Sequence, residues 1–599
     1  MICIRYDADS LSALIVTDSA TLALARIQSA FHDAGIHYGF TDPSTISTPW
    51  WSFLPLAPRI GSIIDSSGDT LTLDEHATRE MARVREQRKA QRESAYLPEQ
   101  VLSNVQMHLE AYGFKRALTP KQVTNVAFMA SRPGSADFSV PGAGKTTTAL
   151  AWFALHYEAT GGKLLVVCPK NAFVAWDQQI RECFKNPEEF TPVRLVGSED
   201  QILRILEHSE AKVFVVGYQR FAQPETRRHI ASFLYRQKSS YLVLDESHRI
   251  KRGNSGQWGS AALSIAHIPT ARLILSGTPV PNSTSDLVPQ YLFLSPHERV
   301  DESNVAEKIK SVYVRTTKPD LNLPPIYRRR LTVDMGPQQQ KLYSLLKSEA
   351  RRQLEGMNPA ALNQYRAIGK SVIKLLQAAA NPALLANDVQ HFHAELYSAL
   401  AHEGLGKKIE LACELTRRLT AKGKKVLIWS SFVDNVEVVA SRLSDLGADY
   451  IHGGVGVGSE EDEDTREAKI KRFHVDDSAM VLVANPAAAG ESISLHTACH
   501  HAIYIDRTFN AAHYLQSEDR IYRYGLKPHQ GTFIFQLTCR NSIDEVVGRR
   551  LTDKINVMSE ILSDPSIRID RPLDLDTDAV DSALDDADLA AFMKHLGST

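Results

Sequence analysis

The feature that most constrains the fold is a series of short apolar runs rich in β-branched residues, with helix-like patterns between them. The runs are KLLVVCPK, KVFVVGY, YLVLDES, RLILSGT, KVLIWSS, MVLVANP, HAIYID and TFIFQLT. Such runs are typical of parallel strands buried on both faces and joined by helices. They form two sets around a helix-favouring stretch from about Gln338 to Gly406. The sequence predicts an α/β protein with two parallel-sheet lobes and a helical insertion.

The same division sets the expected domain boundaries. We expect a small N-terminal accessory domain at 1–110, a first lobe at 111–318, a linker and helical insertion at 319–405, a second lobe at 406–560 and an acidic C-terminal tail at 561–599. The accessory domain includes a charged helical stretch from Glu75 to Arg92 but no recognisable chemistry. In the tail Asp alternates with apolar residues, which favours a solvated or marginal helix.

Composition excludes several classes of protein. Hydrophobic residues make up 43% of the chain and charged residues 23%, the balance of a soluble globular protein. The sequence shows no apolar run of membrane-spanning length and no basic signal-peptide start, so we expect a cytoplasmic protein without a membrane partner. The six cysteines form no CxxC pair, and disulfides are not expected. With a net charge of -2, any binding of phosphates would depend on a local groove.

The segment SVPGAGKTTTALAWFAL indicates a phosphate-binding loop that leads into a helix. Glycines allow the backbone to approach phosphates closely, and the free amides at the helix start point toward them. Lys145 is expected to reach the β and γ phosphates, and Thr146 the magnesium ion. Ser139 stands where the general pattern has its first glycine. The residues predicted to bind ATP here are Gly142, Ala143, Gly144, Lys145, Thr146 and Thr147.

An acidic pair ends the run YLVLDES about a hundred residues later. Carboxylates at the end of a buried strand are costly unless they hold a cation. We therefore expect Asp245 to organise magnesium and Glu246 to orient and polarise the attacking water. Near the end of the second lobe, LQSEDRIYRYG offers Arg520 and Arg523 for the charge that develops during phosphoryl transfer. Their spacing of three predicts that both lie on one face of a helix.

In order from about Leu118 to Val547, the motifs resemble those of the Swi/Snf-like ATPases of helicase superfamily two. LTPKQ is similar to the adenine-sensing element, which implies Gln122 as a base contact. LLVVCPKNAFVAWDQQI, VVGYQRF and LILSGTPVPNSTSDL resemble the next first-lobe motifs. The nucleic-acid or coupling residues that this implies are Lys170, Tyr218, Ser276 and Thr278.

The second half of the chain continues the resemblance. VRTTKPDLNLPP and LLQAAANPALL are similar to the family's linker and helical insertion, which ordinary strand-separating helicases lack. VLIWSSF implies a nucleic-acid contact at Ser431, and ANPAAAGESISL implies Gly490 for nucleotide and Ser492 for backbone contact. Arg520 and Arg523 match the paired arginines. The resemblance implies two RecA-like lobes, ATP and magnesium as cofactors, and DNA as partner.

Three departures from the family pattern concern substrate preference more than hydrolysis. PGAGKT lacks the acidic residues that usually precede the family's loop, the quartet after the strand is DESH, and ANPAAAGES replaces a loop richer in glycine and arginine. The cluster His496, Cys499, His500 and His501 has ligand types that suit zinc, but its place at a strand entry favours packing.

Three functions stay open at this point. The first is an ATP-dependent translocase on double-stranded DNA. The second is a strand-separating helicase on DNA or RNA, for which no wedge element is recognisable in the sequence. The third is an ATP-gated DNA-binding subunit of a genome-defence, repair or restriction complex with protein partners. The sequence leaves the oligomeric state open.

Overall fold

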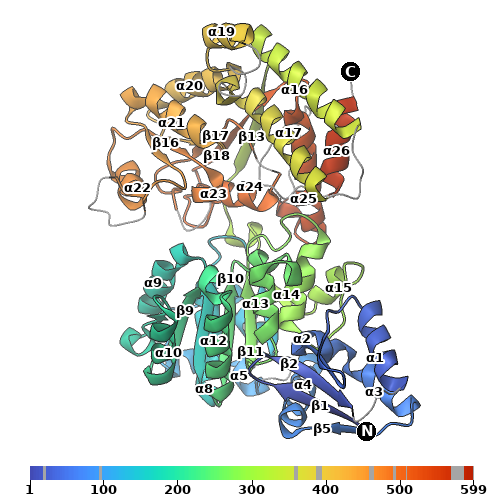
Figure 1. Cartoon of the computed structure of the whole chain (residues 1–599). Helices are drawn as coiled ribbons and strands as arrows, with labels where there is room; N and C mark the ends of the chain where they lie inside the picture. The colour runs from blue at the N-terminus through green and yellow to red at the C-terminus, as the bar shows by residue number, and fades with distance from the viewer. Residues whose placement is uncertain are drawn as a thin grey trace. The chain divides into compact units, whose positions relative to one another are not determined.

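The computed structural model describes residues 1–17, 22–93, 97–355, 362–385, 394–456, 464–489, 494–507, 509–567 and 586–597. The chain divides into two compact units. Unit 1 comprises Met1–Val280 and Thr284–Thr316, and unit 2 comprises Pro281–Ser283 and Thr317–Thr599. The two units are described separately below (Figure 1).

Unit 1 begins with a small five-stranded sheet of order β3-β4-β2-β1-β5. Neighbouring strands are antiparallel except for the parallel pair β1 and β5. Three helices follow the strands and bury apolar side chains such as Phe31 and Trp50. The elements are β1 (Ile2–Asp7), β2 (Ser12–Thr17), α1 (Leu22–Asp33), β3 (Gly39–Asp42), β4 (Thr45–Pro49), α2 (Trp50–Phe53), α3 (Ala57–Ser66) and β5 (Leu71–Leu73).

The charged helix α4 (Glu75–Glu93) joins this small sheet to the first lobe. Gln87 accepts a hydrogen bond of 3.0 Å from the fully buried guanidinium of Arg272, and its amide donates to the carbonyl of Pro269. The hydroxyl of Tyr6 lies 2.9 Å from Nε2 of His267. Buried polar groups need such partners. These contacts therefore fix the N-terminal sheet on the first lobe.

The first lobe is built on a seven-stranded sheet of order β12-β6-β11-β10-β7-β9-β8, in which all neighbours are parallel. The strands are β6 (Gly134–Asp137), β7 (Lys163–Cys168), β8 (Val193–Arg194), β9 (Val213–Gly217), β10 (Ser240–Asp245), β11 (Ala271–Leu275) and β12 (Tyr313–Val314). The helices include α5 (Glu99–Ser103), α6 (Val105–Ala111), α7 (Pro120–Ala130), α8 (Lys145–Thr160), α9 (Phe173–Cys183), α10 (Glu199–His208), α11 (Tyr218–Phe221), α12 (Pro224–Arg236), α13 (Gln257–Ile265), α14 (Leu287–Leu294) and α15 (Val305–Ile309). Helix α8 is buried along most of its length, since its apolar side chains join the main core cluster.

Unit 2 contains a six-stranded sheet of order β13-β18-β17-β14-β16-β15, again with parallel neighbours. Its strands are β13 (Ile326–Val333), β14 (Val426–Trp429), β15 (Asp449–Ile451), β16 (Val481–Ala484), β17 (His501–Tyr504) and β18 (Thr532–Cys539). The helices around it are α20 (Lys407–Thr420), α21 (Val433–Arg442), α22 (Arg466–Val475), α23 (Pro486–Ala489) and α24 (Ala511–Glu518). Their apolar faces form a second core cluster on this sheet.

A helical layer lies beside the second sheet. Its members are α16 (Pro337–Glu355), α17 (Leu362–Ala380), α19 (Ala394–Glu403), α25 (Ile543–Ile561) and α26 (Asp586–Gly597). Although α16 and α26 are far apart in sequence, they contact each other, and both lie near α25 (Figure 1). The side chains of Asp588, Phe592 and Leu596 in α26 are buried. This part of the C-terminal segment is thus packed, where the sequence pattern favoured a solvated tail.

The predicted fold class is confirmed, with two parallel-sheet α/β lobes and helices inserted between their strand sets. All eight apolar runs form strands, namely β7, β9, β10, β11, β14, β16, β17 and β18. All six cysteines are free thiols, as expected. In the described part of the chain, no helix is long and apolar enough to cross a membrane.

Candidate active site

Three loops of the first lobe meet at one edge of its sheet. Strands β6, β11 and β10 are parallel neighbours, so their carboxyl ends lie at the same edge. The phosphate-binding loop follows β6, Ser276 follows β11, and Asp245 ends β10. In open parallel sheets, ligands bind at this edge. The fold therefore brings together segments that are more than a hundred residues apart.

The loop before α8 has the backbone of a phosphate cradle. Gly142 and Gly144 both have φ of +86°, a left-handed conformation that side chains rarely adopt. A Cβ atom on Gly144 would lie 2.6 Å from Nε2 of Gln122, so a side chain here would collide. Lys145 is the first residue of α8, and its Nζ donates a 2.8 Å hydrogen bond to the carbonyl of Ser139. The lysine is thus held over the loop whose amides would face phosphates.

Ser139 has a structural role at the position of the missing glycine. It is buried, and its hydroxyl accepts a 2.8 Å hydrogen bond from the backbone N–H of Thr316. Its own N–H donates to Oδ1 of Asp137 at 2.9 Å, while Oδ2 of Asp137 accepts from Thr148 at 2.8 Å. Ser139 therefore anchors the loop to the segment after β12, and Asp137 links it to α8. This explains how the loop forms without the first glycine.

Gln122 lies next to the loop, at the start of α7. Its Oε1 accepts from the N–H of Thr119 at 2.9 Å, and the hydroxyl of Thr119 accepts from the N–H of Gln122, which makes a capping box. Its Nε2 donates to the carbonyl of Ala143 at 3.0 Å. One amide proton and one lone pair remain for a ligand. The position is compatible with the base contact that the resemblance implies.

Two aromatic residues of neighbouring elements hold Asp245 in place. Nε1 of Trp176 donates to its Oδ2 at 3.0 Å, and its Oδ1 accepts from the N–H of Glu246 at 3.0 Å. The hydroxyl of Tyr218 donates to the Asp245 carbonyl at 2.7 Å. Burial raises the pKa of Tyr218 well above its usual value, and Asp245 adds to the shift. Tyr218 is only 3% exposed, so its contact with Asp245 suits a coupling role better than direct contact with nucleic acid.

A route of polar contacts leads from Glu246 to the SGT segment. Glu246 has φ of +54°, an uncommon conformation that turns the chain after β10. Its Oε2 lies 3.4 Å from Nδ1 of His248, and the same nitrogen lies 3.2 Å from the hydroxyl of Ser276. The Ser276 oxygen also accepts from the N–H of Thr278 at 3.1 Å. The histidine of the DESH quartet, which the sequence showed only as a departure, thus connects the acidic pair to the SGT segment.

The remaining first-lobe predictions lie on the same side of the fold. Thr146 and Thr147 occupy the first turn of α8, and the Thr147 hydroxyl donates to Oε1 of Gln179 at 2.9 Å. Lys170 starts the short turn after β7 and is exposed. Its side-chain stem lies close to Gly217, at the end of the neighbouring strand β9. Lys170 is therefore accessible to a ligand at the strand ends.

In the second lobe, Ser431 follows β14 and lies among the ends of β16 and β17. Its N–H donates to Oδ1 of Asp506 at 2.6 Å, and its carbonyl accepts from Nδ2 of Asn485 at 2.8 Å. The hydroxyl of Ser430 donates to the other oxygen of Asp506. Burial raises the pKa of Asp506. The sequence reasoning missed Asp506 and Asn485, although each lies near the end of one of the apolar runs, HAIYID and MVLVANP. Gly490 and Ser492 lie outside the described residues.

The arginine pair corrects one prediction. Helix α24 ends at Glu518, so Arg520 and Arg523 lie in the turns beyond it and not on one helix face. Asp519 is the C-cap residue of the helix, and its Oδ1 forms an ion pair of 2.8 Å with Nζ of Lys318. The Arg520 carbonyl accepts from the N–H of Leu495 instead of continuing the helix. Desolvation lowers the pKa of Arg523, which marks its guanidinium as a partly buried cation.

Two further groups have packing roles. Arg328 forms a two-bond ion pair with the buried Glu518 at 2.8 and 2.7 Å. It is therefore occupied within the protein. Sγ of Cys499 donates to the carbonyl of Lys425 at 3.2 Å, and burial raises its pKa to about 12. The His501 ring stacks on Phe533.

Comparison with known families decides the assignment. Residues 138–304 match the model of the SNF2-related domain, and residues 407–525 match that of the helicase conserved C-terminal domain. The chain belongs to the Swi/Snf-like ATPases of helicase superfamily two. Together the two models describe the two parts of a helicase-type ATPase core. The matched ranges contain the phosphate-binding loop, the acidic pair and the arginine pair.

Relatives of this Swi/Snf-like ATPase share about a quarter of its sequence. A probable chromatin-remodeling complex ATPase chain of Oryza sativa is 26% identical, over 69% of this chain and 38% of the relative. The ATP-dependent helicase fft1 of Schizosaccharomyces pombe is 24% identical, over 71% of this chain and 50% of the relative. The mouse chromodomain-helicase-DNA-binding protein 1-like is 23% identical, over 70% and 47%. The chain thus spans half or less of the length of these relatives.

Among solved structures, the Sulfolobus solfataricus SWI2/SNF2 ATPase core in complex with dsDNA is 19% identical. It covers 76% of this chain and 95% of its own chain, with a TM-score of 0.32.

Proposed function

We propose that this Swi/Snf-like ATPase is an ATP-driven translocase on double-stranded DNA. The observation that carries the proposal is the polar route from Glu246 through His248 to Ser276 and Thr278. It joins the residue that would activate water to a segment that resembles the family's coupling motif. A protein that only bound ATP would not need polar contacts between its nucleotide site and this segment. Motion on nucleic acid does need them, because hydrolysis has to change the contacts of a lobe with its track.

The first-lobe residues fit ATP and magnesium. The left-handed glycines of the loop allow its backbone to approach phosphate oxygens, and Lys145 supplies a positive charge next to them. Thr146 and Asp245 would hold the magnesium ion, which would neutralise part of the charge on the phosphates. Trp176 fixes the orientation of the Asp245 carboxylate through its indole N–H. The donor set is therefore oxygen-rich, as magnesium requires.

Glu246 would orient and deprotonate the attacking water. Its backbone has the left-handed conformation directly after β10, and His248 lies close enough to hold the carboxylate in place. A change in the negative charge near Glu246 would alter which hydrogen bonds the imidazole of His248 donates and accepts. Ser276 and Thr278 would pass this change to the surface that holds the nucleic acid.

Arg520 and Arg523 would stabilise the charge on the transferring phosphoryl group once ATP draws the two lobes together. Arginines in this role contribute roughly 10³ to 10⁵ in rate. The partly desolvated guanidinium of Arg523 supports this assignment, since a buried cation is stabilised by an anion. Gln122 would contact the adenine base with the part of its amide that stays free.

Double-stranded DNA is the proposed track, with magnesium and ATP as cofactors. The support comes from the relatives, one of which is named as DNA-binding and another as part of a chromatin-remodeling complex. With a net charge of -2, overall attraction cannot hold the phosphates, so local groups such as the exposed Lys170, together with Ser431 and Ser492, would do so. Contacts with the backbone carry no base information. Stimulation should therefore be independent of DNA sequence.

The test compares ATPase rates of the purified protein with duplex DNA, single-stranded DNA and RNA side by side. We expect duplex DNA of any sequence to stimulate hydrolysis, and the effect to weaken steeply with salt. We also expect displacement of a third strand from a triplex and little separation of a plain forked duplex. Stronger stimulation by RNA, or efficient fork unwinding, would favour a strand-separating helicase. Slow turnover with every nucleic acid until a partner is added would favour an ATP-gated DNA-binding subunit.

A further inference from the structure

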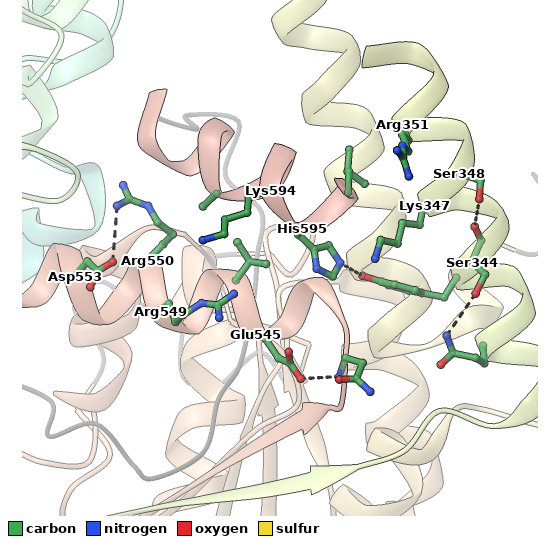
Figure 2. Close-up of a pocket in the computed structure, with 16 residues that line it drawn as sticks. Ser344, Lys347, Ser348, Arg351, Glu545, Arg549, Arg550, Asp553, Lys594 and His595 are labelled. Carbon is green, nitrogen blue, oxygen red and sulfur yellow. Dashed lines mark hydrogen bonds and ion pairs between the residues drawn. The ribbon is translucent and has the colours of Figure 1, made fainter. Parts of the chain in front are cut away.

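A second site lies in unit 2, in a cavity of about 1020 Å³ between α16, α25 and α26 (Figure 2). None of the motifs discussed above contributes to it. Its basic lining comes from all three helices, with Lys347 and Arg351 on α16, Arg549 and Arg550 on α25, and Lys594 and His595 on α26. Drug-sized and cofactor-sized ligands occupy cavities of roughly 300–1,000 Å³. The cavity is therefore large enough for a complete small molecule.

Positive charge exceeds negative charge in this cavity. Among the described residues that line it, the carboxylates are Glu545 and Asp553, against five lysines and arginines. Glu545 already accepts a 2.6 Å hydrogen bond from the N–H of Asn541. Arg550 is bound to Asp588 at 2.6 Å and lies 4.0 Å from Asp553.

Arg549 and Lys594 differ from Arg550 in their ion pairing. Within the described parts of the chain, no carboxylate lies within ion-pairing distance of either side chain. Salt bridges elsewhere in the helical layer satisfy the buried lysine Lys554, so this layer does pair its cations where no ligand is needed. Positively charged side chains held close together in a concave site repel one another, and a bound anion reduces this repulsion.

The pKa of His595 reflects the same excess of positive charge in the cavity. Nε2 of His595 lies 3.0 Å from the hydroxyl of Tyr343, which fixes the ring between α26 and α16. Burial, together with the positive charges of Lys347 and Arg549, lowers the pKa of His595 to about 4. The pKa of Lys347 is also lowered, by burial and by Arg351. Each group therefore experiences the positive charge of the others.

We propose that this cavity binds a small ligand with several phosphate groups, such as a nucleoside polyphosphate or a free polyphosphate. Cations from three helices line one concave space, and arginine pairs with phosphate through two parallel hydrogen bonds (Figure 2). A concave site bounded by helices suits a compact anion better than the rod of a duplex. The ligand would join α26 to α16 and α25 and so stabilise the helical layer of the second lobe.

The test uses tripolyphosphate as the probe and orthophosphate as the singly phosphorylated comparison. The full chain is first saturated with ADP and magnesium, so that the loop around Lys145 does not take up the probe. Calorimetric titration and thermal melting are then measured for the wild type and for Arg549→Ala/Lys594→Ala. The matched control is Lys422→Ala/Arg442→Ala, which removes two exposed cations of the same lobe outside the cavity.

We expect tripolyphosphate to bind the wild type and the control equally and to raise their melting temperature. Binding to Arg549→Ala/Lys594→Ala should be about ten-fold weaker or more, because two charge-assisted contacts are lost. Equal binding to all three proteins would overturn the proposal. So would a variant that keeps tripolyphosphate binding but loses affinity for a single-stranded oligonucleotide, since the cavity would then belong to a nucleic-acid path. If the double variant does not fold, Arg549→Gln alone should still weaken binding of the probe. DNA-free ATPase activity should stay unchanged in every variant, which separates this site from the proposed translocase function.

Discussion

Removing the Ser276 hydroxyl tests the coupling route directly. In Ser276→Ala, the N–H of Thr278 and Nδ1 of His248 each lose a partner, at 3.1 and 3.2 Å. A neutral hydrogen bond contributes about 0.5–1.5 kcal/mol, so the loss of two amounts to about 1–3 kcal/mol. Because 1.4 kcal/mol is a factor of ten, DNA stimulation of hydrolysis should fall by about ten-fold to a hundred-fold. The groups that we propose to contact ATP are untouched, so hydrolysis without DNA should stay within about two-fold of the wild type.

The assay measures ATPase rate with and without duplex DNA, together with displacement of a third strand. Ser240→Ala is the matched control, because Ser240 is a buried serine of β10 whose hydroxyl has no hydrogen-bond partner within the described part of the chain. The control should retain both activities. Two outcomes would refute the reasoning. One is equal loss of rate with and without DNA, which would place Ser276 in the chemistry, and the other is unchanged stimulation, which would remove it from the route.

Three further predictions concern the nucleotide site and the core. Lys145→Ala should abolish ATP turnover by removing the phosphate-facing cation, as measured by phosphate release. Glu246→Gln should bind ATP normally in a fluorescence titration but lose hydrolysis, since an amide cannot polarise water; wild-type turnover in either variant would contradict the assignment. Burial lowers the pKa of His156 to about 3 in the folded protein. In the unfolded chain, the same imidazole binds a proton near its ordinary pKa of about 6.5. Stability should therefore fall as pH drops below about 6.5, by about 2 kcal/mol from this group at pH 5. In thermal melts, His156→Leu should show a smaller drop between pH 7 and pH 5 than the wild type.

The sequence predicted the two sheets because buried parallel strands have an unmistakable composition. All eight apolar runs are strands, but β6 (GSAD) was missed although it is fully buried. Its small residues carry no strand signal, and it is a strand because it lies between β11 and β12. A central position in a sheet depends on tertiary neighbours, which a local pattern does not contain.

The candidate site could be predicted where a motif names the residue, and not where its contacts depend on a partner far away in the sequence. Lys145 and Asp245 follow from motifs, and the structure adds only what holds them. The link from His248 to Ser276 joins two loops whose proximity depends on strand order. The end of α24 before Arg520 was missed for the same reason. Helical spacing predicted one face, whereas Lys318, two hundred residues earlier, binds Asp519 at the helix end.

The packing of α26 leads to a last prediction about stability. Asp588 is fully buried and binds two cations of α25, Arg550 at 2.6 Å and Lys554 at 2.5 Å. Lys554 is itself only 3% exposed, so Asp588→Ala would leave a charge buried without its carboxylate. Breaking a buried pair in this way costs about 3–5 kcal/mol.

We therefore expect Asp588→Ala to lower the melting transition of the second lobe by several degrees and to make the C-terminal helix sensitive to proteases. Asp445→Ala is the matched control, because it removes a carboxylate from an exposed pair with Arg417 in the same unit. Water screens and solvates the cation that remains there, so the control should melt like the wild type. Equal melting of Asp588→Ala and the wild type would mean that Lys554 finds another partner, such as the carbonyl of Phe509, which already accepts from it at 3.2 Å. In that case the ion pair would not be what holds α26, and the apolar contacts of Phe592 and Leu596 would have to do so instead.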